Sequence, residues 1–318
     1  MKRYLLQICL LTLLMSGVSQ AGNGRASLVV DPSWLAAHLH DPQLVLLHVG
    51  DADEYQRAHI HGARLVTLDD ISVSEHTSTG LMLEMPAADD LRQRLQALGI
   101  SDDSKVVVYY GKDWVSPSTR VLFTLQYAGL VKQAVLLDGG MDAWKAAGGE
   151  VNAEPVAATI GELSPLNTQA LVVDADYVRA HLHTPGTVVI DARAGVYYDG
   201  IDEAGAHGQI DKRGHIRGAH SIPFTELTNE QLLLRPQSEL RQLFDAAGVA
   251  PGDTVLGYCH IGQQATAMLF AARLLGHPVL LYDGSYQDWS RAENNPVENP
   301  ADHLADRPVD HPVVRLQP

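Results

Sequence analysis

The sequence predicts an α/β protein made of two similar domains, each with a mostly parallel sheet flanked by helices. Short apolar runs alternate with longer stretches of helical periodicity, which is typical of strand–helix–strand units. The chain has 318 residues, enough for two domains of ordinary size. A set of sequence elements also occurs twice in the same order, and a duplicated domain explains that repetition.

The first repeated element is a short amphipathic helix preceded by an aspartate that can cap it. It spans residues 30–39 in the first half and 173–182 in the second. The other matches, in chain order, are the strands 44–49 and 187–192, the turns 58–63 (Ala-His-Ile-His-Gly-Ala) and 214–219 (Gly-His-Ile-Arg-Gly-Ala), and the segments 137–144 (Leu-Asp-Gly-Gly-Met-Asp-Ala-Trp) and 282–289 (Tyr-Asp-Gly-Ser-Tyr-Gln-Asp-Trp).

These matches set the expected domain boundaries. We expect an N-terminal domain at 22–149 and a C-terminal domain at 171–293. Residues 150–170 are rich in Gly, Ala, Pro and Glu without a sustained period, which indicates a linker. Residues 294–318 carry repeated Pro, Asp and His and are predicted to form an extended tail.

The second half shows the alternation of strands and helices most clearly. Its expected strands are Val188–Asp191, Ser221–Ile222, Thr254–Tyr258 and Val279–Tyr282. Its expected helices are Glu239–Ala247 and Ala265–Leu275. Ligands of such sheets lie outside the carboxyl ends of the strands. Asp191 and Cys259 both fall at such ends.

Residues 1–21 have the pattern of a secretory signal. Lys2 and Arg3 precede an apolar stretch, and Ser19-Gln20-Ala21 provides a small-residue cleavage site. The pattern predicts export, with the periplasm as the expected location; an uncleaved membrane anchor is the alternative. Cleavage would remove Cys9 and leave a single cysteine, Cys259, which cannot form an internal disulfide.

The charge of the chain restricts its partners. Removing Lys2 and Arg3 would lower the basic count from 23 to about 21 against 38 acidic residues, a net charge of about −17. Such a surface repels nucleic acid and anionic membranes, and no membrane span is expected after cleavage. An anionic substrate must therefore be bound by a local arrangement of donors.

Cys259 is the strongest candidate for a nucleophile. It follows the apolar run 254–258 and precedes a loop and a helix, whose N-terminal partial positive charge favours a thiolate. Gly262, Gln263 and Gln264 favour an open loop here. A buried structural cysteine is the alternative.

Together, these repeated elements and the strand–Cys–loop–helix segment resemble the rhodanese family of sulfurtransferases. The tandem arrangement resembles thiosulfate and 3-mercaptopyruvate sulfurtransferases, and the resemblance covers roughly residues 29–289. It implies two rhodanese-like domains, of which only the C-terminal one is active. The family's catalytic cysteine opens an active-site loop, which corresponds here to Cys259 followed by His260, Ile261, Gly262, Gln263 and Gln264. Related phosphatases and arsenate reductases have a longer loop that ends in arginine, which this chain lacks.

The resemblance also implies the chemistry. The Cys259 thiolate would take the outer sulfur of a small anionic donor as a persulfide and pass it to cyanide or a thiol. Backbone N–H groups of the loop would stabilise the anions. No cofactor beyond the covalent persulfide is expected, and a thiol of another protein is a further candidate acceptor. A non-catalytic persulfide carrier or thiol sensor is the alternative function.

Four residues outside the loop are expected to support it. Asp191 and Arg193 match a supporting pair in the family, with a plain surface ion pair as the alternative. Relatives usually carry an arginine where this chain has Tyr197, which favours thiosulfate over 3-mercaptopyruvate as donor. Trp34 aligns with a tryptophan that packs at the domain interface near the cysteine; ordinary core packing is its alternative.

The first half lacks the expected machinery. Tyr109-Tyr110 stands where the second half has Tyr258-Cys259, and His48 and Gly50 stand where it has Asp191 and Arg193. We therefore expect this half to be inactive. The repeated histidines His59 and His215 have no spacing typical of metal ligands and are expected to hydrogen-bond the turns, so no metal site is predicted.

Overall fold

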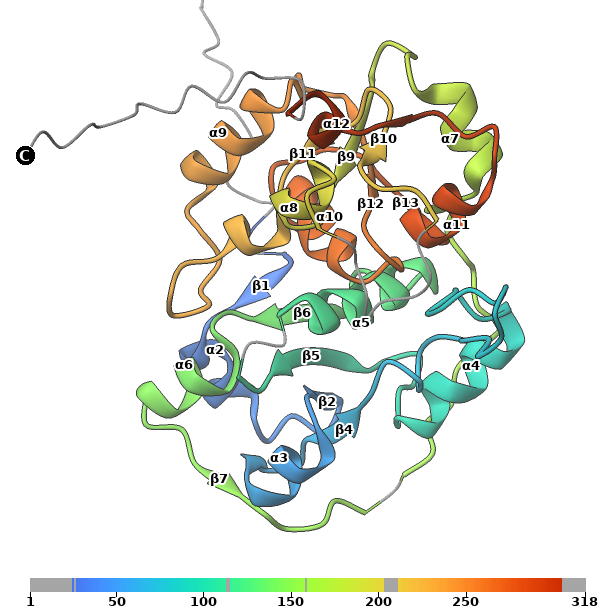
Figure 1. Ribbon diagram of the computed structural model, residues 1–318. Coiled ribbons are helices and arrows are strands. Elements are labelled where there is room, and N and C mark those ends of the chain that lie inside the picture. Colours follow the sequence, from blue (N-terminus) through green and yellow to red (C-terminus); the bar gives the residue numbers. More distant parts are fainter. Residues whose placement is uncertain (1–24, 26, 113–114, 158, 203–210, 305–318) are drawn as a thin grey trace, which may run out of the picture.

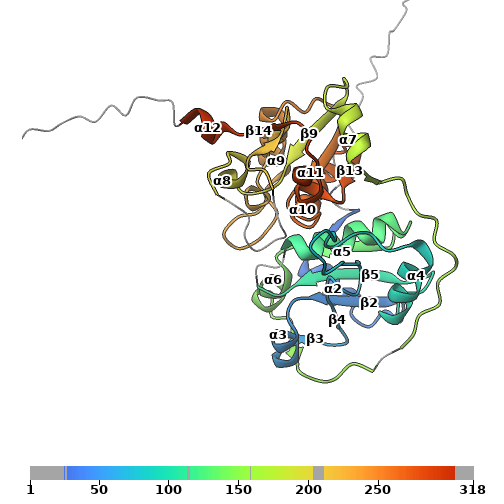
Figure 2. The same cartoon turned by 45° about the vertical axis from the view of Figure 1, so that its right-hand side comes forward.

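The computed structural model describes residues 25, 27–112, 115–157, 159–202 and 211–304 (Figure 1). The predicted signal, residues 1–21, and residues 305–318 of the predicted tail lie outside these ranges. Within them, no helix is both long and apolar enough to cross a membrane. The chain forms two halves that lie one above the other, with helices α5 (Val115–Tyr127) and α10 (Gln264–Leu274) between their sheets (Figures 1 and 2).

Each half contains one parallel sheet of five strands. The strand order in the first is β1 (Val29–Val30), β6 (Ala134–Leu137), β5 (Lys105–Tyr110), β2 (Leu44–Val49) and β4 (Arg64–Val66). The order in the second is β8 (Val172–Val173), β13 (Val279–Tyr282), β12 (Thr254–Tyr258), β9 (Thr187–Asp191) and β11 (His220–Ser221). The two sheets correspond strand by strand, so the predicted α/β class and duplication are confirmed.

Helices flank both sheets. Besides α5, the first half contains α2 (Pro32–His38), α3 (Ala52–Arg57), α4 (Ala88–Ala97) and α6 (Gly140–Ala146). Besides α10, the second contains α7 (Ala175–His181), α8 (Gly195–Tyr198), the 3-10 helix η1 (Phe224–Leu227), α9 (Gln237–Ala246), α11 (Ser285–Arg291) and α12 (Pro300–Leu304). The predicted caps are present: Asp31 accepts the N–H of Trp34 at 2.8 Å, and Asp174 accepts that of Tyr177 at 2.9 Å.

Each repeat closes with a strand that the sequence analysis assigned elsewhere. Strand β7 (Val151–Asn152) pairs antiparallel with β3 (His59–Ile60), although it falls in the predicted linker. Strand β14 (Val297–Glu298) pairs in the same way with β10 (His215–Ile216), although it falls in the predicted tail. In both halves a tryptophan indole bonds the segment before this strand: Trp144 Nε1 donates to Glu150 O at 2.9 Å, and Trp289 Nε1 donates to Pro296 O at 3.1 Å.

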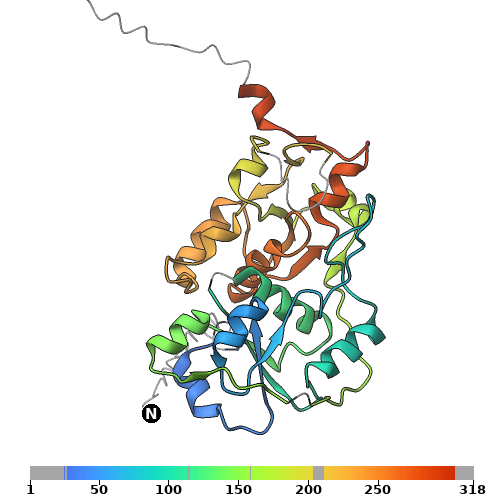
Figure 3. The same ribbon diagram turned by 60° about the horizontal axis from the view of Figure 1, so that its bottom comes forward.

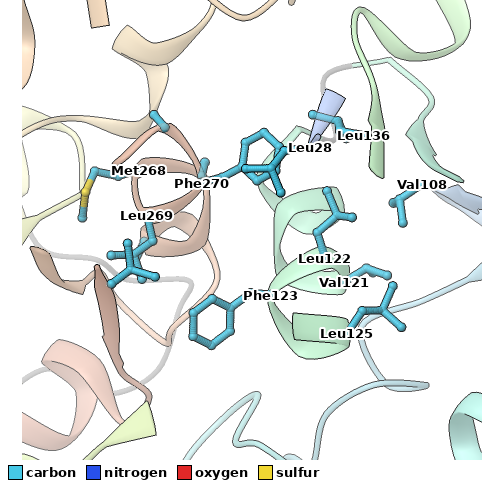
Figure 4. Close-up of a cluster of buried hydrophobic side chains, with 14 of the residues drawn as sticks. Leu28, Val108, Val121, Leu122, Phe123, Leu125, Leu136, Met268, Leu269 and Phe270 are labelled. Atoms are coloured by element: carbon cyan, nitrogen blue, oxygen red, sulfur yellow. The ribbon is translucent and has the colours of Figure 1, made fainter. Parts of the chain in front are cut away.

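The largest apolar cluster continues from one half into the other. Residues 116–125 of α5 are all buried, because this helix lies between its own sheet and α10. Phe270 of α10 lies beside Leu28, and Phe123 of α5 points toward α10 (Figure 4). Inside the helix pair, the hydroxyls of Thr119 and Thr266 share a hydrogen bond of 3.0 Å. The two domains therefore share one core, and the loop after Cys259 lies at its edge.

Candidate active site

Cys259 is the first residue after β12, next to the end of β9, where Tyr258 pairs with Asp191. Its backbone is held by the start of α11. The N–H of Cys259 donates to Ser285 Oγ at 3.2 Å, and its carbonyl accepts the N–H of Tyr286 at 3.0 Å. The carbonyl of His260 accepts the N–H of Gln287, also at 3.0 Å. These contacts fix the position of Cys259 relative to the sheet.

The sequence analysis missed Ser285, although the repeat contains the signal for it. Ser285 has a left-handed φ of +52°, and the first half has a glycine, Gly140, with a φ of +54° at this position. A serine in this conformation is strained. Its hydroxyl donates to Tyr282 O at 2.8 Å and accepts the N–H of Cys259, which explains why the second half carries a serine here.

The loop after Cys259 contains several backbone N–H groups that can donate hydrogen bonds. In the described part of the chain, the N–H groups of residues 261–264 have no hydrogen-bond acceptor, and α10 begins directly at Gln264. Gly262 has a φ of +80°, and a Cβ there would lie 2.8 Å from Asp283 O and 3.0 Å from the Arg120 guanidinium. Glycine is therefore required for the turn. Backbone N–H groups without acceptors at a helix N-terminus are suited to bind an anion.

The loop is less open than its composition indicated. Cys259 is fully buried and His260 is 2% exposed, whereas Ile261, Gln263 and Gln264 are partly exposed. The half-buried ring of Tyr197 meets His260 edge-on, with ring centroids 4.8 Å apart. Burial excludes water from the sulfur and limits the size of a reagent that can reach it.

Asp191 and Arg193 form a buried pair that supports Cys259. Arg193 Nη2 donates to Asp191 at 2.6 Å and to Gly214 O at 2.7 Å. Both side chains are buried, so the alternative of a surface ion pair is wrong. The guanidinium also stacks on the ring of Tyr286, 4.0 Å from its centroid, and the N–H of Tyr286 binds the Cys259 carbonyl. Through these contacts Arg193 holds the loop in position. Its guanidinium therefore faces other groups of the protein.

A residue of the N-terminal domain completes the site, and sequence reasoning missed it. Arg120 of α5 is fully buried, and its Nη1 donates to Asp283 at 2.7 Å and to Gly262 O at 3.0 Å. Its Nη2 donates to the carbonyl of Leu83. Asp283 in turn accepts the N–H of Met85 at 2.6 Å. One arginine of the first domain therefore holds the loop after Cys259.

The loop around residues 73–85 extends this connection along α11 (Figure 3). Met82 donates its N–H to Gln287 at 3.1 Å, and Arg291 donates to Thr79 O at 2.7 Å. Burial, together with the nearby Asp283 carboxylate, raises the pKa of Glu84 from 4.5 to about 7, while Arg120 opposes the shift. The ionised form of Glu84 is thus unfavourable in the folded protein.

Replacing Glu84 by glutamine should make the protein more stable at high pH. The folded-state pKa of Glu84 lies above its ordinary value, so wild-type stability falls as pH rises from about 4.5 through about 7. The Glu84→Gln variant does not lose stability in this way. The difference in stability between the variant and the wild type should therefore vanish near pH 5. Urea unfolding at about pH 5 and about pH 8 measures it. The exposed Glu230→Gln, outside this loop, is the control, and an equal advantage of Glu84→Gln at both pH values would contradict the account.

Trp34 does not lie where the family resemblance implied. It packs on the cluster formed by Leu35, Trp144 and Tyr109 and stacks on His38 with ring centroids 3.9 Å apart. This cluster covers the face of the first sheet opposite to α5, away from the C-terminal domain. Its counterpart in the repeat, Tyr177, stacks on His181 in the same way at 3.9 Å. The alternative of core packing therefore describes Trp34.

The corresponding position in the first half has a different composition. His48 pairs with Tyr109 in the register in which Asp191 pairs with Tyr258. The Tyr109 hydroxyl accepts the N–H of Ile60 at 3.0 Å, as the Tyr258 hydroxyl does for Ile216 at 3.1 Å. His48 is fully buried, and burial lowers its pKa to about 4. A neutral imidazole thus replaces the supporting carboxylate.

The repeated histidines bind main-chain groups, as expected. His59 Nδ1 lies 2.8 Å from Tyr55 O and its Nε2 lies 3.0 Å from Glu154 O. His215 Nδ1 lies 2.8 Å from Tyr198 O. Each ring also stacks on the tyrosine that it bonds, at 4.0 Å and 3.7 Å. These contacts are structural and hold the repeated turns at strands β3 and β10, with which the closing strands pair.

Comparisons with known proteins agree with the fold of the two domains. Residues 31–147 and 174–292 each match the rhodanese-like domain. A probable 3-mercaptopyruvate sulfurtransferase of Pseudomonas aeruginosa is 33% identical over 83% of this chain and 95% of its own. A putative thiosulfate sulfurtransferase of Mycobacterium bovis is 29% identical over 86% and 98%. An anaerobic ergothioneine biosynthesis enzyme from Chlorobium limicola shares the fold, with a TM-score of 0.75 and 21% identity over 85% of this chain and 70% of that one.

Proposed function

Since the chain belongs to the rhodanese family of sulfurtransferases, we propose that it transfers a sulfane sulfur through a persulfide on Cys259. One observation carries the proposal. Cys259 stands at the junction of β12 and α10, and the backbone N–H groups of residues 261–264 follow it without acceptors among the described residues. Those donors suit the negative charge of a thiolate, a persulfide and an incoming oxyanion.

The proposed reaction has two half-reactions. The Cys259 thiolate attacks the outer sulfur of the donor, a new S–S bond forms, and the remainder leaves with the electron pair of the broken bond. For thiosulfate the leaving group is sulfite. A nucleophile such as cyanide or a thiolate then attacks the outer sulfur of the persulfide, and the Cys259 thiolate is released. The scheme uses no cofactor and predicts ping-pong kinetics.

We favour thiosulfate as the donor on the basis of the residues around the loop. The guanidinium groups of Arg193 and Arg120 face Asp191 and Asp283, so the loop N–H groups are the main donors for an anion. Full burial of Cys259 favours a compact reagent. The second candidate is 3-mercaptopyruvate, which the name of the Pseudomonas relative favours. Its carboxylate would require a recognition group, and Tyr197 offers a single neutral hydroxyl.

Replacing Tyr197 by arginine tests the choice of donor. We expect wild-type kcat/KM to be higher for thiosulfate than for 3-mercaptopyruvate, with cyanide in excess. A neutral hydrogen bond is weaker than a charge-assisted one by about 1 kcal/mol, which is several-fold in affinity. Tyr197→Arg should therefore raise the use of mercaptopyruvate several-fold more than the use of thiosulfate. Tyr197→Phe is the control. A wild-type preference for mercaptopyruvate, or an equal effect of Tyr197→Arg on both donors, would contradict this assignment.

The proposed setting is outside the cytoplasm. It rests on the signal pattern of residues 1–21, which lie outside the described part of the chain. The net charge of −15 favours small or protein thiols over nucleic acid as acceptors. Fractionating cells that express the full chain, followed by N-terminal sequencing of the product, tests both export and cleavage after Ala21.

A further inference from the structure

The boundary between the domains contains a cleft that is separate from the Cys259 loop. Two cavities of about 520 Å³ and 360 Å³ share Arg273 and His277 in their walls. The first domain contributes Lys132 to the larger cavity and Gln126 to the smaller one. Arg273 is in the last turn of α10, a helix about 16 Å long whose first turn follows the active loop. The cleft and Cys259 are therefore at opposite ends of one helix.

The side chain of Arg273 is charged but has no partner of opposite charge. Among the described residues its guanidinium makes no hydrogen bond or ion pair, and burial lowers its pKa to about 10 without a charged neighbour to offset the shift. Partly burying a cation without a carboxylate costs free energy, and most such groups are paired. The residues lining the two cavities include no aspartate or glutamate.

The walls of the cleft differ in character. Lys132, which is exposed, lines the larger cavity together with Arg273. The smaller cavity adds the ring of Tyr177 and the apolar side chains of Leu171 and Leu280. Two cations in a protein with a net charge of −15 make a local positive site, next to a surface that can hold an apolar body.

We propose that this cleft binds a small organic anion, with a doubly charged oxyanion head group between Arg273 and Lys132 and an apolar body along Tyr177 and Leu280. The ligand would contact both domains at the end of α10 and stabilise their association. Nothing in the proposed sulfur transfer uses this cleft, so the two sites can be tested separately.

Phenyl phosphate is a suitable probe, because it combines a dianionic head group with an apolar ring. Calorimetric titration of the wild-type protein should show saturable binding, weaker binding of inorganic phosphate, and none of benzyl alcohol. Arg273→Met should weaken the binding of phenyl phosphate about tenfold or more, because a charge-assisted bond is lost. Lys132→Met should weaken it less. Arg241→Met, at an exposed position of α9 outside both cavities, should bind as the wild type does.

The unliganded Arg273→Met protein should be at least as stable as the wild type, because an unpaired partly buried charge is removed. Arg273→Gln provides a polar variant with the same expected loss of binding. Cys259→Ser should bind phenyl phosphate with unchanged affinity, which separates this site from the catalytic loop. No saturable binding to the wild type, wild-type affinity in both Arg273 variants, or weaker binding by Cys259→Ser would each overturn the proposal.

Discussion

Replacing Cys259 by serine should reduce cyanide-dependent formation of thiocyanate to the uncatalysed rate. A serine hydroxyl is a far weaker nucleophile than a thiolate and cannot form a persulfide. The chain has two cysteines, and the other, Cys9, lies within the predicted signal, so no second thiol of the mature protein can substitute. Residual turnover by Cys259→Ser would contradict the assignment.

A matched pair of variants makes this result specific. Cys9→Ser in the full chain should leave the activity of the purified protein unchanged. Cys259→Ser should remain folded, because the substitution conserves size and places one hydroxyl in a buried position at a cost of about 1–3 kcal/mol. Thermal unfolding of both variants shows whether a loss of activity follows from chemistry or from unfolding.

Replacing Arg120 by methionine should have the largest effect on stability. Arg120 and Asp283 are both buried, and removing one partner of such a pair costs about 3–5 kcal/mol. That is a large share of the stability of a typical domain. The same change removes the hydrogen bond that Arg120 donates to the carbonyl of Gly262. Sulfur transfer should therefore fall even under conditions in which the protein stays folded. Urea unfolding and kcat measured at low temperature separate the two effects.

Two further variants test whether the pairing of charges explains the loss. Arg94→Met breaks the partly exposed pair with Asp90 and should cost about 1 kcal/mol or less. The double variant Arg120→Met/Asp283→Asn removes both buried charges and should be more stable than Arg120→Met alone. If Arg120→Met is no more destabilising than Arg94→Met, Arg120 does not hold the domains together.

Local patterns in the sequence predicted the parts of the fold that depend on neighbouring residues. Strands β12 and β13 have the predicted bounds, and α10 begins one residue earlier than expected. The loss of the supporting pair in the first half was also predictable, because the repeat aligns His48 with Asp191 and the strand register agrees. The position of Cys259 followed from the same alternation of strand, loop and helix.

Contacts between distant segments were not predictable in this way. Arg120 lies 142 residues from Gly262 and 163 from Asp283, and nothing around it in α5 indicates a role in the second domain. Strands β7 and β14 have two residues each, too few to show a period. The packing of Trp34 could have been inferred from the repeat. Tyr177 occupies the same position in the second half and stacks on a histidine in the same way, which indicates packing within each domain.

The most direct measurement of the central claim is the intact mass of the protein after incubation with thiosulfate. The wild-type protein should gain one sulfur atom and lose it on addition of cyanide, with thiocyanate released in equal amount. Digestion should place the added sulfur on Cys259, and Cys259→Ser should gain none. A wild-type protein that turns over thiosulfate without ever gaining this sulfur would contradict a persulfide mechanism.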